Sequence, residues 1–272
     1  MAILSEETWI KEELAFLGEL GLGAKDQDHN EVTRIQEWVT YFGFVTGIDG
    51  DFGPATEKAV RKFQGAKRLP ETGRVDEVTF RALTMPLVAV LAPPAPKPTT
   101  MSDAIVAFAK QHLSVHPIET GGPNCGPWVR FYMKGRQGEE WLWCAGFACT
   151  IVRQASELLG SKSPITYQVG CDAIAREAER LGSSFAGTDV IRDPTKARKI
   201  TPGSLFLIRN QNNPGDWIHT GIVIDADSHS FTTIEGNSNT AGGRNGFEVC
   251  QRERGYKQAD FFLINVDTAA IA

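Results

Sequence analysis

Cys144 is the residue whose sequence surroundings most favour nucleophilic chemistry. It opens a stretch in which apolar residues recur at intervals of three and four as far as Gly160, the pattern of a helix with one buried face. In the first turn of a helix, unpaired backbone N–H groups and the positive end of the helix dipole favour a thiolate over a thiol. A thiolate is an effective nucleophile only if a base and an orienting group reach it. Without them, Cys144 is a small buried core residue.

A possible base and two possible orienting groups follow Cys144 in the chain. His219 begins a predicted strand over residues 219–224, and Glu235 and Asn237 lie on or just beyond the next predicted strand. Because side chains alternate along a strand, residues 235 and 237 are expected on the same face. An imidazole can take the thiol proton and later protonate a departing amine, and a polar partner fixes its tautomer and angle. Taken singly, His219 also fits a hydrogen-bonded strand end, and residues 235–237 also fit a turn.

The order of predicted elements around these residues indicates the fold class of the region from about Met101 to the C-terminus. Helices come first and strands later, which indicates an α+β domain with an antiparallel sheet. A nucleophile on a helix, with its partners on a following sheet, is the order of a papain-like hydrolase. The expected helices cover about residues 102–113, 126–134, 144–160 and 171–181, and the expected strands 204–208, 219–224, 230–235 and 261–264.

Four short motifs in this region share a pattern with a known family. They are Trp143-Cys144-Ala145-x-Phe147, Pro202-Gly203-Ser204, His219-Thr220-Gly221-Ile222-Val223 and Glu235-Gly236-Asn237. Over about residues 115–265 the chain resembles the CHAP family of cysteine- and histidine-dependent amidohydrolases and peptidases. The resemblance implies that Cys144 is the nucleophile, His219 the base, and Glu235 with Asn237 the orienting pair. The backbone N–H of Cys144, aimed by the helix start, is one expected oxyanion donor.

Some members of that family carry an acidic calcium-binding loop before the cysteine. Residues 119–143 contain no Asp-x-Asp run, so we expect no metal and no cofactor. Trp143 and Trp217 lie close in sequence to the proposed site and are candidates for lining a substrate groove, although packing in the core is an equally good interpretation. The remaining cysteines (125, 149, 171 and 250) are interpreted as structural.

The N-terminal part of the chain predicts a small helical bundle. Helices are expected over about residues 5–20 and 31–42, then from Pro54, which suits a first helical turn, and finally a short helix after Asp76. The loop over residues 47–53 is rich in Gly and Asp, which permits a tight turn. A calcium loop at Asp49-x-Asp51 is rejected because the later ligand positions, including a closing Glu, are missing.

The pattern of this bundle over about residues 31–84 resembles the peptidoglycan-binding repeat often attached to cell-wall hydrolases. Many positions agree across both loops, including the run from Ile48 to Thr56 and the segment from Leu69 to Gly73. The resemblance implies that this module holds the protein on bacterial peptidoglycan. Asp49, Phe52 and Thr56 are candidate contacts, chosen from their place in or beside the loop.

Composition and length set the remaining expectations. Residues 86–100 hold a cluster of prolines and predict an extended linker between a domain over 1–85 and a domain over 101–272. The net charge is −5 and no basic face is evident, which argues against nucleic-acid binding. No apolar run is long enough for membrane insertion, and the N-terminal residues lack the pattern of a secretory signal, so we expect synthesis in the cytoplasm. The five cysteines lack C-x-x-C spacing, which argues against a zinc site or a complete disulfide framework.

Together these features predict a monomeric murein hydrolase that cleaves an amide bond, either as an N-acetylmuramoyl-L-alanine amidase or as an endopeptidase of the stem or cross-bridge. Wall binding without a recognisable secretion signal is typical of a phage endolysin, which reaches the wall after release. Two alternatives remain open: a catalytically inactive wall-binding or phage-tail structural protein, and a secreted antibacterial effector with the same fold.

Overall fold

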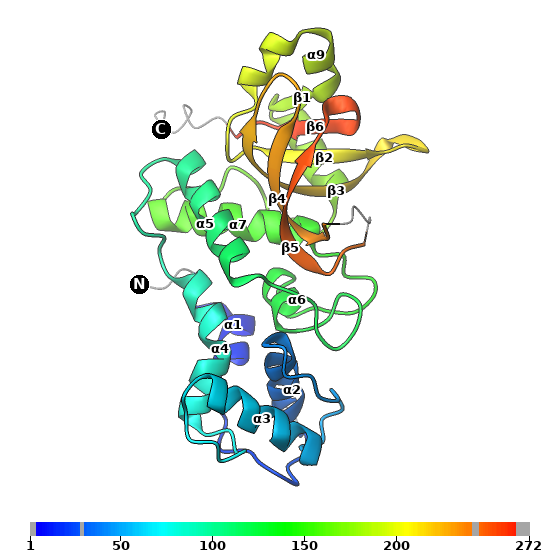
Figure 1. The fold of residues 1–272 in the computed structure, drawn as a ribbon. Helices are drawn as coiled ribbons and strands as arrows, with labels where there is room; N and C mark the ends of the chain where they lie inside the picture. The colour runs from blue at the N-terminus through cyan, green and yellow to red at the C-terminus, as the bar shows by residue number, and fades with distance from the viewer. Residues whose placement is uncertain (1–3, 28–29, 241–244, 265–272) are drawn as a thin grey trace. The chain divides into compact units, whose positions relative to one another are not determined.

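The computed structural model describes residues 4–27, 30–240 and 245–264 (Figure 1). The chain divides into two compact units, each continuous in space but not in sequence. The N-terminal unit comprises Ser5–Leu91 and Ile118–Glu140, and the C-terminal unit comprises Met1–Leu4, Ala92–Pro117 and Trp141–Ala272. Within the described residues, no helix is both long enough and apolar enough to cross a membrane.

The N-terminal unit is helical, as predicted. Its apolar core is built around Trp38, Val60, Phe63 and Leu83, whose side chains are fully buried. Pro54 at the first position of its helix supplies a φ suited to the helix start. The unit contains α1 (Thr8–Leu14), α2 (Glu31–Tyr41), α3 (Pro54–Ala66), α4 (Glu77–Leu91) and α6 (Pro127–Tyr132).

The helix expected over residues 5–20 is shorter in the structure and ends at Leu14. Gly18 takes a φ of 135°, a conformation open mainly to glycine, and the chain after it is extended. Leu20 then forms an isolated antiparallel bridge with Val75, in which each backbone N–H donates to the other residue's carbonyl. Tertiary pairing outside the helix therefore overrides the local apolar periodicity.

The expected linker also begins later than Pro86, because α4 continues through this proline to Leu91. A proline inside a helix costs about 3 kcal/mol through its missing N–H and its steric clash. Leu87, Val90 and Leu91 follow it at helical spacing and are at most 2% exposed. Burying each of these side chains contributes roughly 1.5–3 kcal/mol, which together exceeds the cost of the proline.

Residues 118–140 pack in the N-terminal unit, whereas the sequence placed them in the hydrolase-like domain. Arg130 on α6 forms ion pairs with Glu13, at 3.0 Å, and with Glu37, at 2.6 Å, and both carboxylates are buried. The ring of Trp128 also lies edge-on to that of Trp38 at 6.0 Å. A buried arginine with two carboxylate partners fixes this segment on the helical bundle.

Two buried glutamines, Gln36 and Gln64, each hold one loop of the N-terminal unit through their side-chain amides. Gln36 on α2 donates to Asp49 and to Thr56 and accepts from the backbone N–H groups of residues 49 and 50. Gln64 on α3 repeats the arrangement one helix later, donating to the hydroxyl of Thr79 and accepting from the N–H of Gly73. Each side-chain amide thus supplies hydrogen bonds that a tight loop cannot form within itself.

The C-terminal unit contains an antiparallel sheet that follows a group of helices, as predicted. Six strands pair in the order β1-β6-β2-β3-β4-β5. They are β1 (Ser184–Ala186), β2 (Leu205–Asn210), β3 (Asn213–Ala226), β4 (Phe231–Ser238), β5 (Glu248–Arg254) and β6 (Ala259–Phe262). The helices are α5 (Met101–Val115), α7 (Cys144–Leu159), α8 (Cys171–Arg180) and α9 (Gly187–Arg192), with short 3₁₀ turns at Pro194–Lys199 and Tyr256–Gln258.

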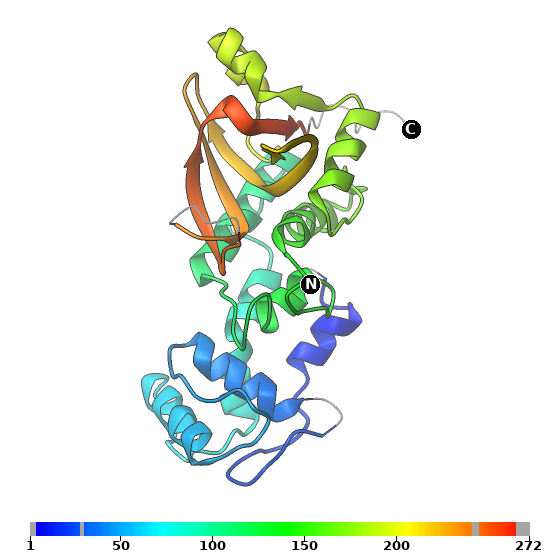
Figure 2. The ribbon, with the colours of Figure 1, turned by 90° about the vertical axis from the view of Figure 1, so that its right-hand side faces the viewer.

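Helix α7 is the central helix of this unit. It packs along α5 and against strands β3 and β4 (Figures 1 and 2). Phe206, Phe231 and Phe261 belong to a buried apolar cluster among the strands. The start of α7 therefore lies beside the middle of the sheet, which is where β3 and β4 carry the residues singled out above.

Candidate active site

Cys144 occupies the first position of α7, as the sequence predicted. Trp143 is the N-cap residue, and its side chain makes no capping hydrogen bond. The N–H groups of the first helical turn therefore remain available near the sulfur. Gly236 explains the close approach of the helix to β4, since a Cβ atom there would lie 2.6 Å from Phe147 and 2.7 Å from the Trp143 ring.

The structure brings His219 to Cys144 and Glu235 to His219. Nε2 of His219 lies 2.8 Å from Oε2 of Glu235, and the imidazole also hydrogen-bonds the Cys144 thiol. The three side chains are almost covered, with residue exposures of 4% for Cys144, 7% for His219 and 0% for Glu235. A sulfur, an imidazole and a carboxylate thus form one continuous chain of hydrogen bonds from α7 through β3 to β4.

Four donors hold the Glu235 carboxylate in place. Arg254 donates from Nε to Oε1 at 2.5 Å and from Nη2 to Oε2 at 2.6 Å. Thr233 donates to Oε1 at 2.6 Å, and Ser238 donates to Oε2 at 2.9 Å. A bidentate arginine and two hydroxyl groups give the carboxylate a single orientation. The position of the His219 ring is fixed through it.

These contacts lower the pKa values of Cys144 and Glu235 and raise that of His219. A hydrogen bond from Cys171, together with the His219 imidazole, holds the pKa of the Cys144 thiol well below its usual value in spite of burial. Burial alone would lower the pKa of His219, but its hydrogen bonds to Cys144 and Glu235 raise it to about 9. Burial alone would likewise raise the pKa of Glu235, but Arg254 and His219 hold it well below its usual value. These directions favour a thiolate–imidazolium pair backed by a carboxylate.

Cys171 is a further member of the site that the sequence did not single out. Its sulfur lies 3.8 Å from that of Cys144, and the neighbouring thiolate raises the pKa of the Cys171 thiol well above its usual value. Cys171 begins α8, and the next residue, Asp172, accepts a hydrogen bond of 2.6 Å from the backbone N–H of Trp217 on β3. The start of α8 is thus fixed beside His219, with a protonated thiol facing a deprotonated one.

Asn237, the second residue expected to orient His219, lies in an irregular part of β4. Strand β4 changes register between Glu235 and Ser238, and Asn237 takes a φ of 52°. Alternation fails in this irregular stretch, so the argument that placed residues 235 and 237 on one face does not apply. Asn237 is 1% exposed, and its role as a second support of His219 stays a prediction.

Three of the five predicted substrate contacts have buried side chains. Phe52 is fully buried, Thr56 is 2% exposed and Trp143 is fully buried, so their side chains pack inside the two units. Asp49 is exposed, but its carboxylate accepts hydrogen bonds from Gln36 and from the backbone of Asp51, which is a loop-forming role. Trp217 alone is half-buried beside the site, and its indole N–H donates to Asp260.

His112 and His116 lie outside this constellation. His112 is fully buried and bonds Gln154 at 2.9 Å, and burial lowers its pKa to about 3, so it is a neutral core residue. His116 pairs with Glu248 at 2.6 Å but is largely exposed. In the part of the chain that the structure describes, no group of three or more His, Cys, Asp or Glu side chains is arranged to hold a metal ion.

Comparison with known families identifies the N-terminal unit. Residues 28–83 match the family model described as a putative peptidoglycan binding domain. The match confirms the module that the sequence pattern over residues 31–84 indicated, and it supports peptidoglycan as a partner. No curated protein matches the chain at a significant level.

Proposed function

We propose that this protein is a peptidoglycan hydrolase in which the N-terminal module binds the wall and the C-terminal unit cleaves an amide bond. The observation that carries the proposal is the hydrogen-bonded series of Cys144, His219 and Glu235. A papain-like fold of the CHAP type is part of the proposal. Its support is a cysteine at the first position of a helix that packs on an antiparallel sheet carrying the histidine and the acid.

In the proposed reaction the Cys144 thiolate attacks the carbonyl carbon of the amide and forms a tetrahedral intermediate. The Cys144 backbone N–H, which has no partner within the helix, is positioned to stabilise the resulting oxyanion. Because Nε2 of His219 is held by Glu235, the ring's other nitrogen is left to exchange protons at the reacting centre. With its pKa raised to about 9, His219 is protonated at neutral pH and can give its proton to the leaving amine.

In the second half of the reaction, water hydrolyses the thioester that joins Cys144 to the substrate. The imidazole, now neutral, takes a proton from water, and the resulting hydroxide attacks the thioester carbonyl. The carboxylic acid product then leaves and the thiolate–imidazolium pair is restored. Throughout the cycle Glu235 stays ionised, because Arg254 holds its pKa low, and it stabilises the imidazolium without itself taking the proton.

One observation favours a role in binding only: Cys144 is 4% exposed, so little of the sulfur is open to a substrate. Digestion of purified peptidoglycan distinguishes the two functions. We expect the parent to release soluble muropeptides and the Cys144→Ser variant to release none. Cys149→Ala, which changes a buried cysteine on the same helix, is the matched control and should retain activity. Equal release by the parent and Cys144→Ser would reject the nucleophile, while no release by either would favour the binding role.

Mass spectrometry of the products identifies the bond that is cut. An amidase separates the glycan from an intact stem peptide, whereas an endopeptidase leaves the stem on the sugar and creates new peptide termini. The same samples therefore test both the activity and its class.

A further inference from the structure

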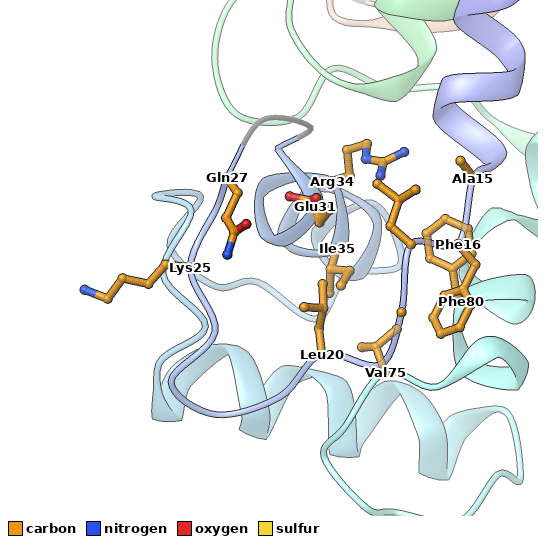
Figure 3. Close-up of a pocket in the computed structure, with 12 residues that line it drawn as sticks. Ala15, Phe16, Leu20, Lys25, Gln27, Glu31, Arg34, Ile35, Val75 and Phe80 are labelled. Atoms are coloured by element: carbon orange, nitrogen blue, oxygen red, sulfur yellow. The ribbon is translucent and has the colours of Figure 1, made fainter.

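A small cavity in the N-terminal unit carries the inference. It lies between the segment that follows α1, the start of α2 and the region where α4 begins (Figure 3). Ile35, Val75 and Phe80 give it an apolar wall and are at most 5% exposed. The rings of Phe16 and Phe80 pack together at 5.7 Å on one side. Glu31 and Arg34 add polar groups from α2.

Arg34 is the unusual residue of this cavity. It is only 7% exposed, and its Nη1 donates to the backbone carbonyl of Glu12. Its Nε is buried and has no hydrogen-bond partner, and no carboxylate of the described residues pairs with the guanidinium. Arg130, in the same unit, has two carboxylate partners. Glu37 interacts electrostatically with Arg34 but forms its direct ion pair with Arg130. Because the buried Nε of Arg34 lacks a hydrogen-bond partner, the guanidinium favours an incoming anion.

The size of the cavity limits the occupant. Its volume is about 210 Å³. Sites for drug-sized ligands span roughly 300–1,000 Å³, and each water takes about 30 Å³, so there is room for one or two small residues. An extended glycan does not fit. The two phenylalanine rings also face each other, which leaves neither as an open stacking surface for a sugar.

We propose that this cavity binds the peptide portion of peptidoglycan, with a free carboxylate at Arg34 and a methyl side chain against Ile35, Val75 and Phe80. The proposal rests on the wall-binding role proposed above. The segment from Ala15 to Leu20 supplies much of the cavity and lies outside the matched residues 28–83. This chain therefore completes the site with residues that precede the family segment.

The test uses the full chain with Cys144→Ser, so that the ligand stays intact, and titrates an alanine-containing stem tripeptide and a peptide-free disaccharide by calorimetry. Arg34→Met removes the cation but keeps a buried linear side chain. Leu17→Asp places a carboxylate on an exposed residue of the cavity wall. Arg81→Met, which removes an exposed arginine of α4, is the matched control. Thermal melts accompany each variant.

We expect tripeptide affinity to fall at least tenfold in Arg34→Met and Leu17→Asp and to stay unchanged in Arg81→Met, with all variants folded. Tripeptide binding that survives Arg34→Met, or binding of the disaccharide alone, overturns the cavity assignment. If the parent still pellets with insoluble peptidoglycan in that case, the wall-binding role stands. If the parent neither pellets nor binds either probe, both proposals fail.

A second inference comes from the pair of thiols in the C-terminal unit. The sulfurs of Cys144 and Cys171 lie 3.8 Å apart, and both residues begin helices. We infer that hydrogen peroxide converts them reversibly into a disulfide that switches the proposed hydrolase off. The Cys144 thiolate attacks the peroxide oxygen to give a sulfenic acid, and the departing oxygen takes a proton and leaves as water. The Cys171 thiol then attacks the sulfenic sulfur, and a second water leaves as the S–S bond forms.

The geometry and protonation states suit this sequence. The sulfurs must approach from 3.8 Å to the bonded distance of about 2 Å. Cys144 has the lowered pKa of the attacking thiol, while Cys171 has a raised pKa and keeps its proton until the sulfenic acid forms. In the thiolate form, Cys171 also donates its S–H to Cys144, so the reduced pair is already in contact.

Peptide mapping after hydrogen peroxide treatment tests the switch without any assay of wall cleavage. We expect one peptide pair containing residues 144 and 171 that has lost the mass of two hydrogen atoms, and recovery of the two separate peptides after a thiol reductant. Cys171→Ser should form no cross-link and should pass to irreversible oxidation at Cys144, whereas Cys250→Ser should behave as the parent. A cross-link to another cysteine, or none in the parent, refutes the inference.

Discussion

The Glu235→Gln substitution tests the electrostatics of the site most directly. The amide keeps nearly the same shape but removes the negative charge that faces Nε2 of His219 at 2.8 Å. Raising the His219 pKa from 6.5 to about 9 corresponds to a stabilisation of the imidazolium by ~3 kcal/mol. Cys144 and Glu235 both act against the effect of burial, so loss of the carboxylate should lower the pKa of His219.

The sign of the effect follows from the direction of the shift. Because the folded-state pKa of His219 is raised, its contribution to stability is complete below pH 6.5 and is lost as the pH rises through about 9. The rate of peptidoglycan cleavage should fall over the same upper range as the imidazolium loses its proton. In Glu235→Gln we expect this alkaline limb to move toward neutrality, with a lower maximal rate.

The measurement is a pH–rate profile of muropeptide release, paired with a titration of the His219 ring by NMR. Glu248→Gln is the matched control, since Glu248 on β5 also pairs with a histidine, His116 at the end of α5. It should leave the profile unchanged. An alkaline limb that stays near pH 9 in Glu235→Gln would show that the carboxylate does not set the protonation of His219, and the proposed role of the acid would be abandoned.

Three further substitutions test the supports of the site and of the wall-binding module. Arg254→Met removes both arginine hydrogen bonds to the buried Glu235. We expect a free energy of unfolding ~3 kcal/mol lower in urea titrations and a reduced cleavage rate. An unchanged rate would show that the arginine is not needed to align Glu235 with His219. Gly236→Ala places a methyl group against Phe147, which should lower the free energy of unfolding by ~2 kcal/mol and displace the start of α7. Activity should then fall by more than the folded fraction measured by circular dichroism. Full activity would contradict the close packing of α7 on β4. Gln36→Leu leaves two backbone N–H groups of the loop over residues 47–53 without their acceptor. The midpoint of thermal unfolding should fall by an amount equivalent to ~3 kcal/mol. An unchanged midpoint would refute the structural role of Gln36.

The periodic parts of the chain were predictable because local pattern and tertiary burial agree there. Helix α7 was expected over residues 144–160 and runs from Cys144 to Leu159, and α8 was expected from residue 171 and begins at Cys171. The peptidoglycan-binding module was also recognisable from the sequence, because its loops depend on Gly, Asp and Thr at fixed positions. Pro86 and the residue 15–20 segment were misassigned, since long-range packing there outweighs local propensity.

The residues of the candidate site also divide into those that the sequence could nominate and those that it could not. Residue type and order along the chain were enough to nominate Cys144, His219 and Glu235, because nucleophile, base and acid must be these kinds of residue. The argument that placed Asn237 on the same face as Glu235 does not hold, because an irregularity in β4 breaks the alternation on which it depended. Arg254 and Cys171 had no local signal: one lies on a strand that the sequence did not reveal, and the other is a single cysteine at a helix start.

The sequence by itself determined the kinds of chemistry available, the two-part character of the chain and the helical and strand segments whose periodicity is strong. Only the tertiary structure decided which side chains meet. It paired Arg254 with Glu235, set Cys171 against Cys144 and left Arg34 buried without a carboxylate partner among the described residues. Such encounters depend on how strands and helices pack across long separations in the chain, and no pattern of neighbouring residues encodes them.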